Sequence, residues 1–178
     1  FYDPDSSKLY FWPPSNSNPN NLSIRGKTQS YAFKINNSDY VELRNLEFFG
    51  TTFKFDNCDF SVVDYCNLFY PSCYKRMLGV VDTIPEMSIF LSSSYCKVIR
   101  SAFRYTDGSA LEMYSGNNTI EDCYFYHIDY SVTDLNSLMT TIQMGGANNT
   151  IRRNTMHRLG ASATLNPGDA SLITLNDI

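Results

Sequence analysis

Apolar and polar positions alternate in short stretches along the chain, and one such pattern recurs six times. Each copy has an aliphatic residue, two spacers, a central residue, one spacer and a large apolar residue. The copies begin 20, 35, 22, 31 and 22 residues apart. A repeat of this length predicts stacked structural units. The six copies are Leu43-x-x-Leu46-x-Phe48, Val63-x-x-Cys66-x-Leu68, Val98-x-x-Ser101-x-Phe103, Ile120-x-x-Cys123-x-Phe125, Ile151-x-x-Asn154-x-Met156 and Ile173-x-x-Asn176-x-Ile178.

A second alternating stretch precedes each copy, at residues 33–35, 53–55, 89–91, 111–113, 142–144 and 164–166. Period-two alternation indicates a β-strand with one buried face. Asn, Gly, Ser, Asp and Pro residues, which favour bends, stand between the two stretches of each unit. A unit of short strands without a helix cannot bury its apolar face alone. The units must therefore stack with parallel strands about 4.8 Å apart.

The two long steps equal one repeat plus an insertion. The insertions fall near residues 70–87 and 129–139, and both precede the first strand of a unit. The pattern therefore predicts an all-β solenoid of about six rungs over residues 31–178, with two insertion loops. A leucine-rich repeat is the competing solenoid, but most copies have Cys, Ser or Asn where that repeat requires leucine.

The repeat resembles the right-handed parallel β-helix of extracellular polysaccharide lyases, pectin-degrading enzymes and related glycoside hydrolases. Two phrases carry the likeness, one running from Gly116 to Phe125 and the other from Gly145 to His157. The central positions also resemble the internal side-chain stacks of that family, with Leu46 as the exception. The resemblance implies a right-handed coil over residues 31–178, and it implies no particular reaction.

Residues 1–30 do not repeat. A Pro-Asp-Ser turn separates two short strand-like stretches, and Pro13 and Pro14 end the second, so the sequence predicts a β-hairpin-like N-terminal segment. The phrase resembles an insertion in large bacterial-type β-helix glycoside hydrolases. Because the last residues stop within a repeat, we expect a longer polypeptide, with the remainder of the chain or like subunits at the open ends.

Composition narrows the possible partners. Fourteen Lys and Arg residues against 18 Asp and Glu residues give a net charge of −4, which argues against a nucleic-acid partner. No apolar run is long enough for a membrane span. The 13 Tyr and 12 Phe residues favour strands over helices.

Five cysteines show no metal-binding spacing, so we expect no metal site and no cofactor. Cys66 and Cys123 share a column two rungs apart, roughly 10 Å, which is too far for a disulfide and predicts buried thiols. Cys58, Cys73 and Cys96 fall in turns or near the first insertion, where one bridge could form. Glycosylation sequons begin at Asn21, Asn36, Asn117 and Asn148 on predicted surface turns.

In the lyases that this repeat resembles, substrate lies along the outward side of one strand stack, rimmed by long loops. The corresponding surface here is predicted to bind a polysaccharide or other glycan, because aromatic, amide and charged side chains suit sugars. An ordinary solvated sheet face is the alternative. The predicted outward column consists of Lys34, Lys54, Phe90, Glu112, Gln143 and Leu165.

Glycoside hydrolysis would need two carboxyl groups, with Glu112 as the central candidate and Asp107 or Asp134 as its partner. Asp129, also on the second insertion, is another possible partner, and Asp82 and Glu86 lie on the first insertion. Elimination would need a base, for which Arg76 and Arg104 are candidates. His127 and His157 are predicted to be surface or loop residues away from the outward column.

These patterns favour a segment of a secreted or cell-surface carbohydrate-binding or carbohydrate-active β-helix protein, such as a glycoside hydrolase or polysaccharide lyase. The alternative is a non-catalytic structural or adhesive component of a surface filament or appendage. Sparse ionisable residues on the strands and four sequons favour that alternative. The sequence does not decide whether the protein is an enzyme.

Overall fold

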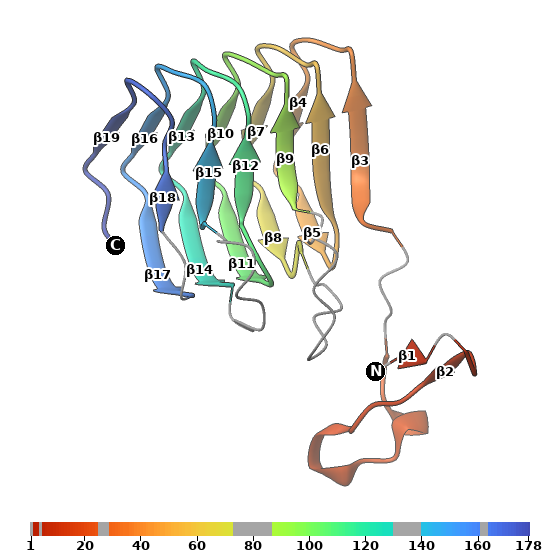
Figure 1. Ribbon diagram of the computed structural model, residues 1–178. Helices are drawn as coiled ribbons and strands as arrows, with labels where there is room; N and C mark the ends of the chain where they lie inside the picture. Colours follow the sequence, from red (N-terminus) through yellow and green to blue (C-terminus); the bar gives the residue numbers. More distant parts are fainter. Residues whose placement is uncertain (1, 4, 25–28, 73–86, 130–139, 161–163) are drawn as a thin grey trace.

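A computed structural model describes residues 2–3, 5–24, 29–72, 87–129, 140–160 and 164–178. Most of the two predicted insertions, with Cys73, Arg76, Asp82, Glu86 and Asp134, lies outside the described residues. The described part from Tyr31 onward is a coil of short strands in which each rung contributes to three sheets. The strands of one sheet lie side by side along the stack (Figure 1).

The first sheet has six strands in the order in which the rungs follow one another: β3 (Tyr31–Asn36), β6 (Thr52–Asp56), β9 (Ser88–Leu91), β12 (Leu111–Met113), β15 (Ile142–Met144) and β18 (Leu165–Asn166). The second sheet has six: β4 (Glu42–Arg44), β7 (Val62–Asp64), β10 (Lys97–Ile99), β13 (Thr119–Glu121), β16 (Thr150–Arg152) and β19 (Leu172–Thr174). The third has five: β5 (Glu47–Phe49), β8 (Asn67–Phe69), β11 (Ala102–Thr106), β14 (Tyr124–Ile128) and β17 (Thr155–Leu159).

Pairing within these three sheets is parallel throughout, and its register follows the repeat. Val98 pairs with Ile120, and Ile120 pairs with Ile151. In the third sheet, Phe103 pairs with Phe125. Equivalent positions of successive copies therefore lie above one another. The prediction of a parallel β-helix of about six rungs is confirmed.

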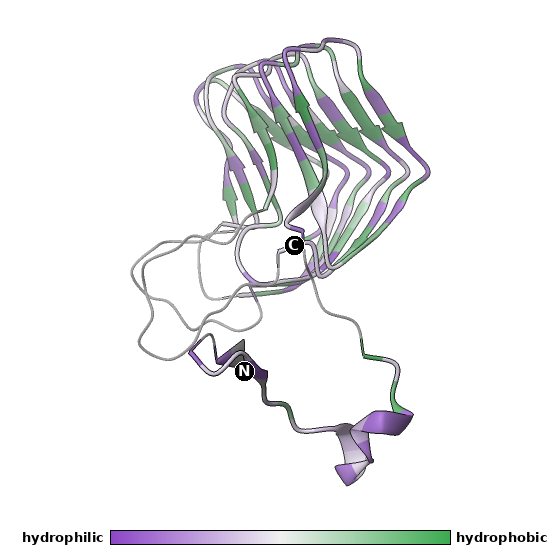
Figure 2. Ribbon diagram, turned by 90° about the vertical axis from the view of Figure 1, so that its right-hand side faces the viewer, coloured by the Kyte–Doolittle hydropathy of each residue, from purple (hydrophilic) through white to green (hydrophobic). Residues whose placement is uncertain are grey.

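The interior of the coil is filled by buried apolar side chains. Figure 2 shows hydrophobic residues recurring along the stacked strands. Phe55 and Phe90 stack with centroids 4.6 Å apart and an interplanar angle of 4°. Phe103 and Phe125 stack similarly at 5.2 Å and 8°. All four are 0% exposed. Burying each such ring contributes roughly 1.5–3 kcal/mol, so the stack is a main source of stability.

A column of polar side chains runs inside the bend between the second and third sheets. The Cys66 amide donates to the Ser101 hydroxyl at 3.0 Å, and the Cys123 amide donates to Asn154 Oδ1 at 2.9 Å. The Asn154 amide donates in turn to Asn176 Oδ1 at 2.9 Å. At the bend, a backbone N–H group cannot take part in regular strand pairing. A side chain of the next rung accepts its hydrogen bond instead.

The thiols of this column act as donors. Burial raises the pKa of the Cys123 thiol to about 12, and the thiol donates to the Val98 carbonyl at 3.5 Å and to the Glu121 carbonyl at 3.3 Å. Cys66 is buried in the same way. The prediction that Cys66 and Cys123 are buried free thiols is confirmed.

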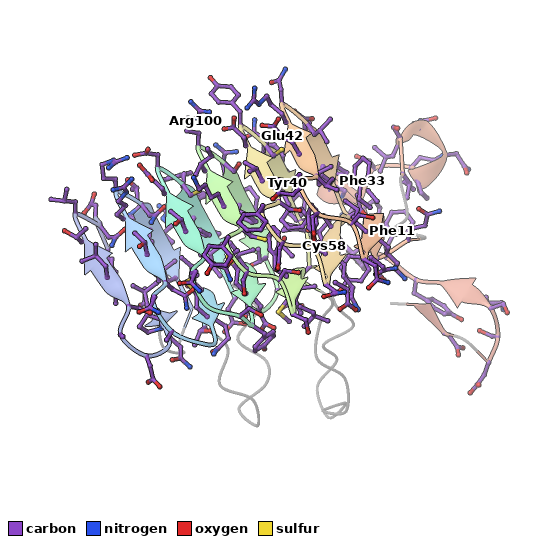
Figure 3. All side chains as sticks on the ribbon, turned by 90° about the horizontal axis from the view of Figure 1, so that it is seen from above. Phe11, Phe33, Tyr40, Glu42, Cys58 and Arg100 are labelled. Atoms are coloured by element: carbon purple, nitrogen blue, oxygen red, sulfur yellow. The ribbon has the colours of Figure 1, made fainter. Side chains whose placement is uncertain are left out.

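A second polar column runs inside the bend before the second sheet. Cys96 donates its amide N–H to Asn118 Oδ1 at 2.8 Å, and Asn118 donates its own to Asn149 Oδ1 at 3.0 Å. Cys58 and Cys96 are free thiols that lie inside these bends, so neither forms the bridge that their positions in the sequence allowed. Figure 3 shows Cys58 within the stack, away from the outer edge where Glu42 and Arg100 project.

Each bend between the second and third sheets contains one residue with positive φ, between 47° and 56°. This conformation costs roughly 1–2 kcal/mol for a residue other than glycine. In every bend except that of the last described rung, the cost is offset because the backbone N–H of this residue donates to the next rung, as for Arg100 to Glu121 O at 3.0 Å. These residues are Asn45, Tyr65, Arg100, Asp122, Arg153 and Leu175.

The N-terminal segment contains the predicted hairpin, with β1 (Tyr2–Asp3) antiparallel to β2 (Lys8–Leu9). Two short 3-10 turns follow, η1 (Pro14–Asn16) and η2 (Pro19–Asn21), each starting at a proline. Proline suits the first position of such a turn because it lacks an N–H group that would stay unpaired. No helix in the described residues is long and apolar enough to cross a membrane.

We predict that Asn154→Ala destabilises the fold by about 1–3 kcal/mol, because the buried Cys123 amide loses its acceptor. Asn36→Ala is the control, since Asn36 is an exposed strand residue of the first rung; it should change stability by less than about 0.5 kcal/mol. Urea unfolding of both variants measures the difference. Equal changes in the free energy of unfolding for both variants would show that the polar column does not stabilise the fold through this hydrogen bond.

Candidate functional site

The outward face of the first sheet carries a single column of side chains, one from each rung. The pairing register places Lys34 beside Lys54, Lys54 beside Ile89, and Glu112 beside Gln143. Ile89 also pairs with Glu112, and Gln143 with Asn166. The outward column therefore consists of Lys34, Lys54, Ile89, Glu112, Gln143 and Asn166.

Two residues of the predicted outward column face inward instead. Phe90 is fully buried, pairs with Phe55 and Met113 in the register, and stacks on Phe55. It cannot offer a ring to a sugar, so this prediction is wrong. Leu165 packs against the core. In both cases, the stretch read from the sequence was shifted by one residue, which turns every side chain to the opposite face.

Glu112 stands at the centre of the outward column with only 9% of its surface exposed. Tyr114, two residues further along, donates its hydroxyl to Glu112 Oε2 at 2.6 Å. Burial raises the pKa of the Glu112 carboxyl, although its hydrogen bonds to Tyr114 and Ser109 act in the opposite direction. Burial also raises the pKa of the Tyr114 hydroxyl. Glu112 is thus a carboxyl group that holds its proton more tightly than an exposed one.

The other candidate acids are placed differently. Asp107 lies between β11 and β12, is 5% exposed, and donates its backbone N–H to Ser72 O at 2.7 Å. Asp129 follows β14 and is 7% exposed. On the outward face, Asp56 forms an ion pair with Lys54 at 3.5 Å. Asp56 stands on β6, two strands from Glu112 on β12 and so roughly 10 Å away along the stack, which is longer than the 5–9.5 Å carboxyl spacing of glycosidases.

The amides at the far end of the column bind each other. Asn166 Nδ2 donates to Gln143 Oε1 at 3.1 Å, and Thr140 also donates to this oxygen at 3.3 Å. At the other end, the Lys34 ammonium lies 5.4 Å from the centre of the Tyr31 ring. From β3 to β18 the face therefore changes from cationic to apolar, then to acid and phenol, and finally to amide.

The sequence prediction missed a second polar and aromatic face, on the outward side of the third sheet. Its column consists of Phe49, Phe69, Arg104, Tyr126 and His157, which pair in register. Each of these residues directly follows the last apolar position of a repeat copy, so the same alternation could have revealed the column. Arg104, considered above as a base, lies on this face rather than beside Glu112. His157 is exposed, and His127 is half-buried at the edge of the same face.

The four sequon asparagines, Asn21, Asn36, Asn117 and Asn148, are all exposed. Asn117 and Asn148 both have positive φ, at 60° and 61°, and occupy equivalent bends of successive rungs. The residues after them, Asn118 and Asn149, are buried in the polar column. In each Asn-Asn pair, the first side chain is thus exposed and the second is buried.

Among the residues that the structure describes, no three His, Cys, Asp or Glu side chains gather as a metal site would require. Comparisons with protein-family models, with curated proteins and with solved structures find no match. The class of protein is therefore defined by its architecture, which is a parallel β-helix with three sheets.

We predict that the stability of the wild-type protein falls relative to Glu112→Gln as the pH rises from 4.5, the ordinary pKa of this group. The raised pKa means that the folded state binds this proton more tightly than the unfolded state does. Between the pKa of the unfolded state and that of the folded state, unfolding releases the proton, so a rise in pH favours unfolding. Glutamine keeps an acceptor for Tyr114 but cannot ionise. Denaturation midpoints from pH 4 to pH 8 measure the difference, and a constant difference would contradict burial of an ionisable carboxyl.

Proposed function

We propose that this protein is a secreted or cell-surface carbohydrate-binding β-helix that holds a glycan chain along the outward face of the first sheet. The observation that carries the proposal is the continuous outward column of Lys34, Lys54, Ile89, Glu112, Gln143 and Asn166. Because the strands pair in parallel register, successive side chains of the column follow one another at the spacing between strands. A linear polymer can therefore meet successive side chains along one line.

The chemistry of the column suits a sugar chain in three ways. Gln143 and Asn166 offer amide donors and acceptors for hydroxyl groups. Ile89 offers an apolar surface for the C–H face of a sugar ring. Lys54 offers a positive charge to acidic sugars, although it also forms an ion pair with Asp56. Glu112 can donate or accept a hydrogen bond, depending on its protonation.

Binding is favoured over cleavage on this face. Glycoside hydrolysis needs a second carboxyl group flanking the bond. The only other carboxylate on the described outward face of the first sheet is Asp56, which is paired with Lys54 about two strand spacings away from Glu112.

A second proposal is a non-catalytic structural or adhesive component, supported by the exposed Asn117 and Asn148 on neighbouring rungs. Mass spectrometry of the protein from its native source tests for glycans at these asparagines, and electron microscopy tests for a filament. An unglycosylated monomer that degrades polysaccharide would contradict this second proposal.

Calorimetric titration with acidic and neutral polysaccharides tests the first proposal. We expect Gln143→Ala to weaken binding about five- to tenfold, because one or two hydrogen bonds are lost. Asn57→Ala is the matched control, since Asn57 is an exposed amide in a bend outside the column; it should leave the affinity unchanged. Absence of binding to every polysaccharide, or equal losses in both variants, would contradict a glycan site on the first sheet.

A further inference from the structure

The described arginines fall into two groups. The four on or beside the second sheet all form ion pairs: Arg44 and Arg100 with Asp64, Arg152 with Glu121, and Arg153 with Glu121 and Asp122. Arg104 and Arg158 lie on or beside the outward face of the third sheet. Within the described part of the chain, no carboxylate lies within ion-pair distance of either. Within these described residues, no carboxylate therefore neutralises their charges, although the whole chain has a net charge of −4.

Aromatic rings hold both guanidinium groups in place. The guanidinium carbon of Arg104 lies 5.2 Å from the centre of the Phe69 ring and 5.5 Å from that of Tyr124. Arg158 lies 5.7 Å from the centre of the Tyr126 ring. Cation–π contacts of this kind fix a planar cation while leaving its edge free for hydrogen bonds. The two arginines are thus preorganised rather than freely mobile.

Each guanidinium keeps donors available. Arg104 donates through one nitrogen to Asn67 Oδ1 at 2.9 Å, and Arg158 lies 3.0 Å from His127 Nε2. Because arginine can only donate, His127 must accept at Nε2 and carry its proton on Nδ1. A guanidinium has five N–H groups, and in the described residues each arginine uses one of them, which leaves further donors for a ligand. A carboxylate or sulfate can use two of them at once.

Rings surround these cations on the same face. The Tyr124 and Tyr126 rings are stacked with centroids 5.8 Å apart, and Tyr126 also stacks with His157 at 5.8 Å. Along the neighbouring edge, Tyr70 stacks on Tyr105 at 5.2 Å. Each phenol ring combines an apolar surface with a hydroxyl group. A sugar ring has the same two features, so the two suit each other.

We propose that the outward face of the third sheet is a second binding site, which takes an anionic sugar chain through Arg104 and Arg158, with the Tyr124 and Tyr126 rings beside them offering apolar edges and hydroxyl groups. Arg104 and Arg158 lie on rungs two strand spacings apart, roughly 10 Å. The site therefore suits a polymer with spaced carboxylate or sulfate groups. It occupies a different sheet from the glycan site proposed above and does not depend on it.

Charge favours a sugar chain over a nucleic acid. A nucleic acid carries a phosphate on every nucleotide, and its binding sites have many cations along a groove. Here, two arginines that pair with no carboxylate of the described segments stand on a face whose other end carries Glu47, close to the exposed Phe49. A sparsely charged polymer fits this arrangement better.

The test compares Arg104→Gln and Arg158→Gln with Arg44→Gln. The control loses the same charge from the second sheet, and Asp64 keeps Arg100 as its partner. The probes are polygalacturonate, dextran sulfate, neutral dextran and an oligothymidylate. We expect Arg104→Gln and Arg158→Gln each to weaken binding of the acidic polysaccharides about tenfold or more. Arg44→Gln should bind as the wild type does, and neutral dextran should bind much more weakly.

Circular dichroism confirms that each variant is folded, and Tyr124→Leu provides a second measurement that leaves both charges in place. Its expected result is weaker binding with an unchanged dependence on salt. Three results would overturn the proposal: equal losses in all arginine variants, tighter binding of the oligothymidylate, or self-association that disappears with Arg104→Gln. If the proposed site on the first sheet fails instead, only the effect of Gln143→Ala disappears, so the two failures are distinguishable.

Discussion

The structure depends on hydrogen bonds that run from each rung to the next, parallel to the axis of the coil. Strands of two to six residues supply most of them, but the chain must also bend between the sheets, where regular pairing is interrupted. There, side chains take over: the Cys123 amide donates to Asn154, and the Cys96 amide donates to Asn118. Because a buried N–H group without a partner is costly, the bends require small or amide residues inside.

This constraint explains why the repeat tolerates such varied residues elsewhere. Cysteine, serine and asparagine interchange in the inner columns because each has a short side chain that can reach a neighbouring backbone group. Outside, the left-handed position of the bend is occupied by residues as different as Tyr65, Arg100 and Leu175. Their side chains are exposed, and the backbone N–H groups of Tyr65 and Arg100 still pair with the next rung. The fold therefore leaves its outer faces free to vary and to carry chemistry.

The three faces use this freedom differently. On the second sheet the arginines find carboxylates, because buried Asp64 accepts hydrogen bonds from Arg100 at 2.9 and 2.6 Å and pairs with Arg44. The first sheet presents a graded column with one buried carboxyl, Glu112. The third sheet holds two cations among aromatic rings, and no carboxylate in the described ranges pairs with them. A face that satisfies its own charges has little to offer a charged partner, whereas the third sheet retains unused donors, which makes it the best-equipped face for recognising one.

The sequence by itself determined the parallel solenoid, the number of rungs and the alignment of Val98, Ile120 and Ile151, because a repeat that cannot bury its apolar residues alone has to stack in register. It also identified Lys34, Lys54, Glu112 and Gln143 as outward. It failed for Phe90, because an alternating stretch of three residues does not fix its own phase; only pairing with Phe55 and Met113 does. The tertiary structure alone decided which arginines find carboxylates. Asp64 lies 20 residues from Arg44 and 36 from Arg100 along the chain, and stacking brings all three together.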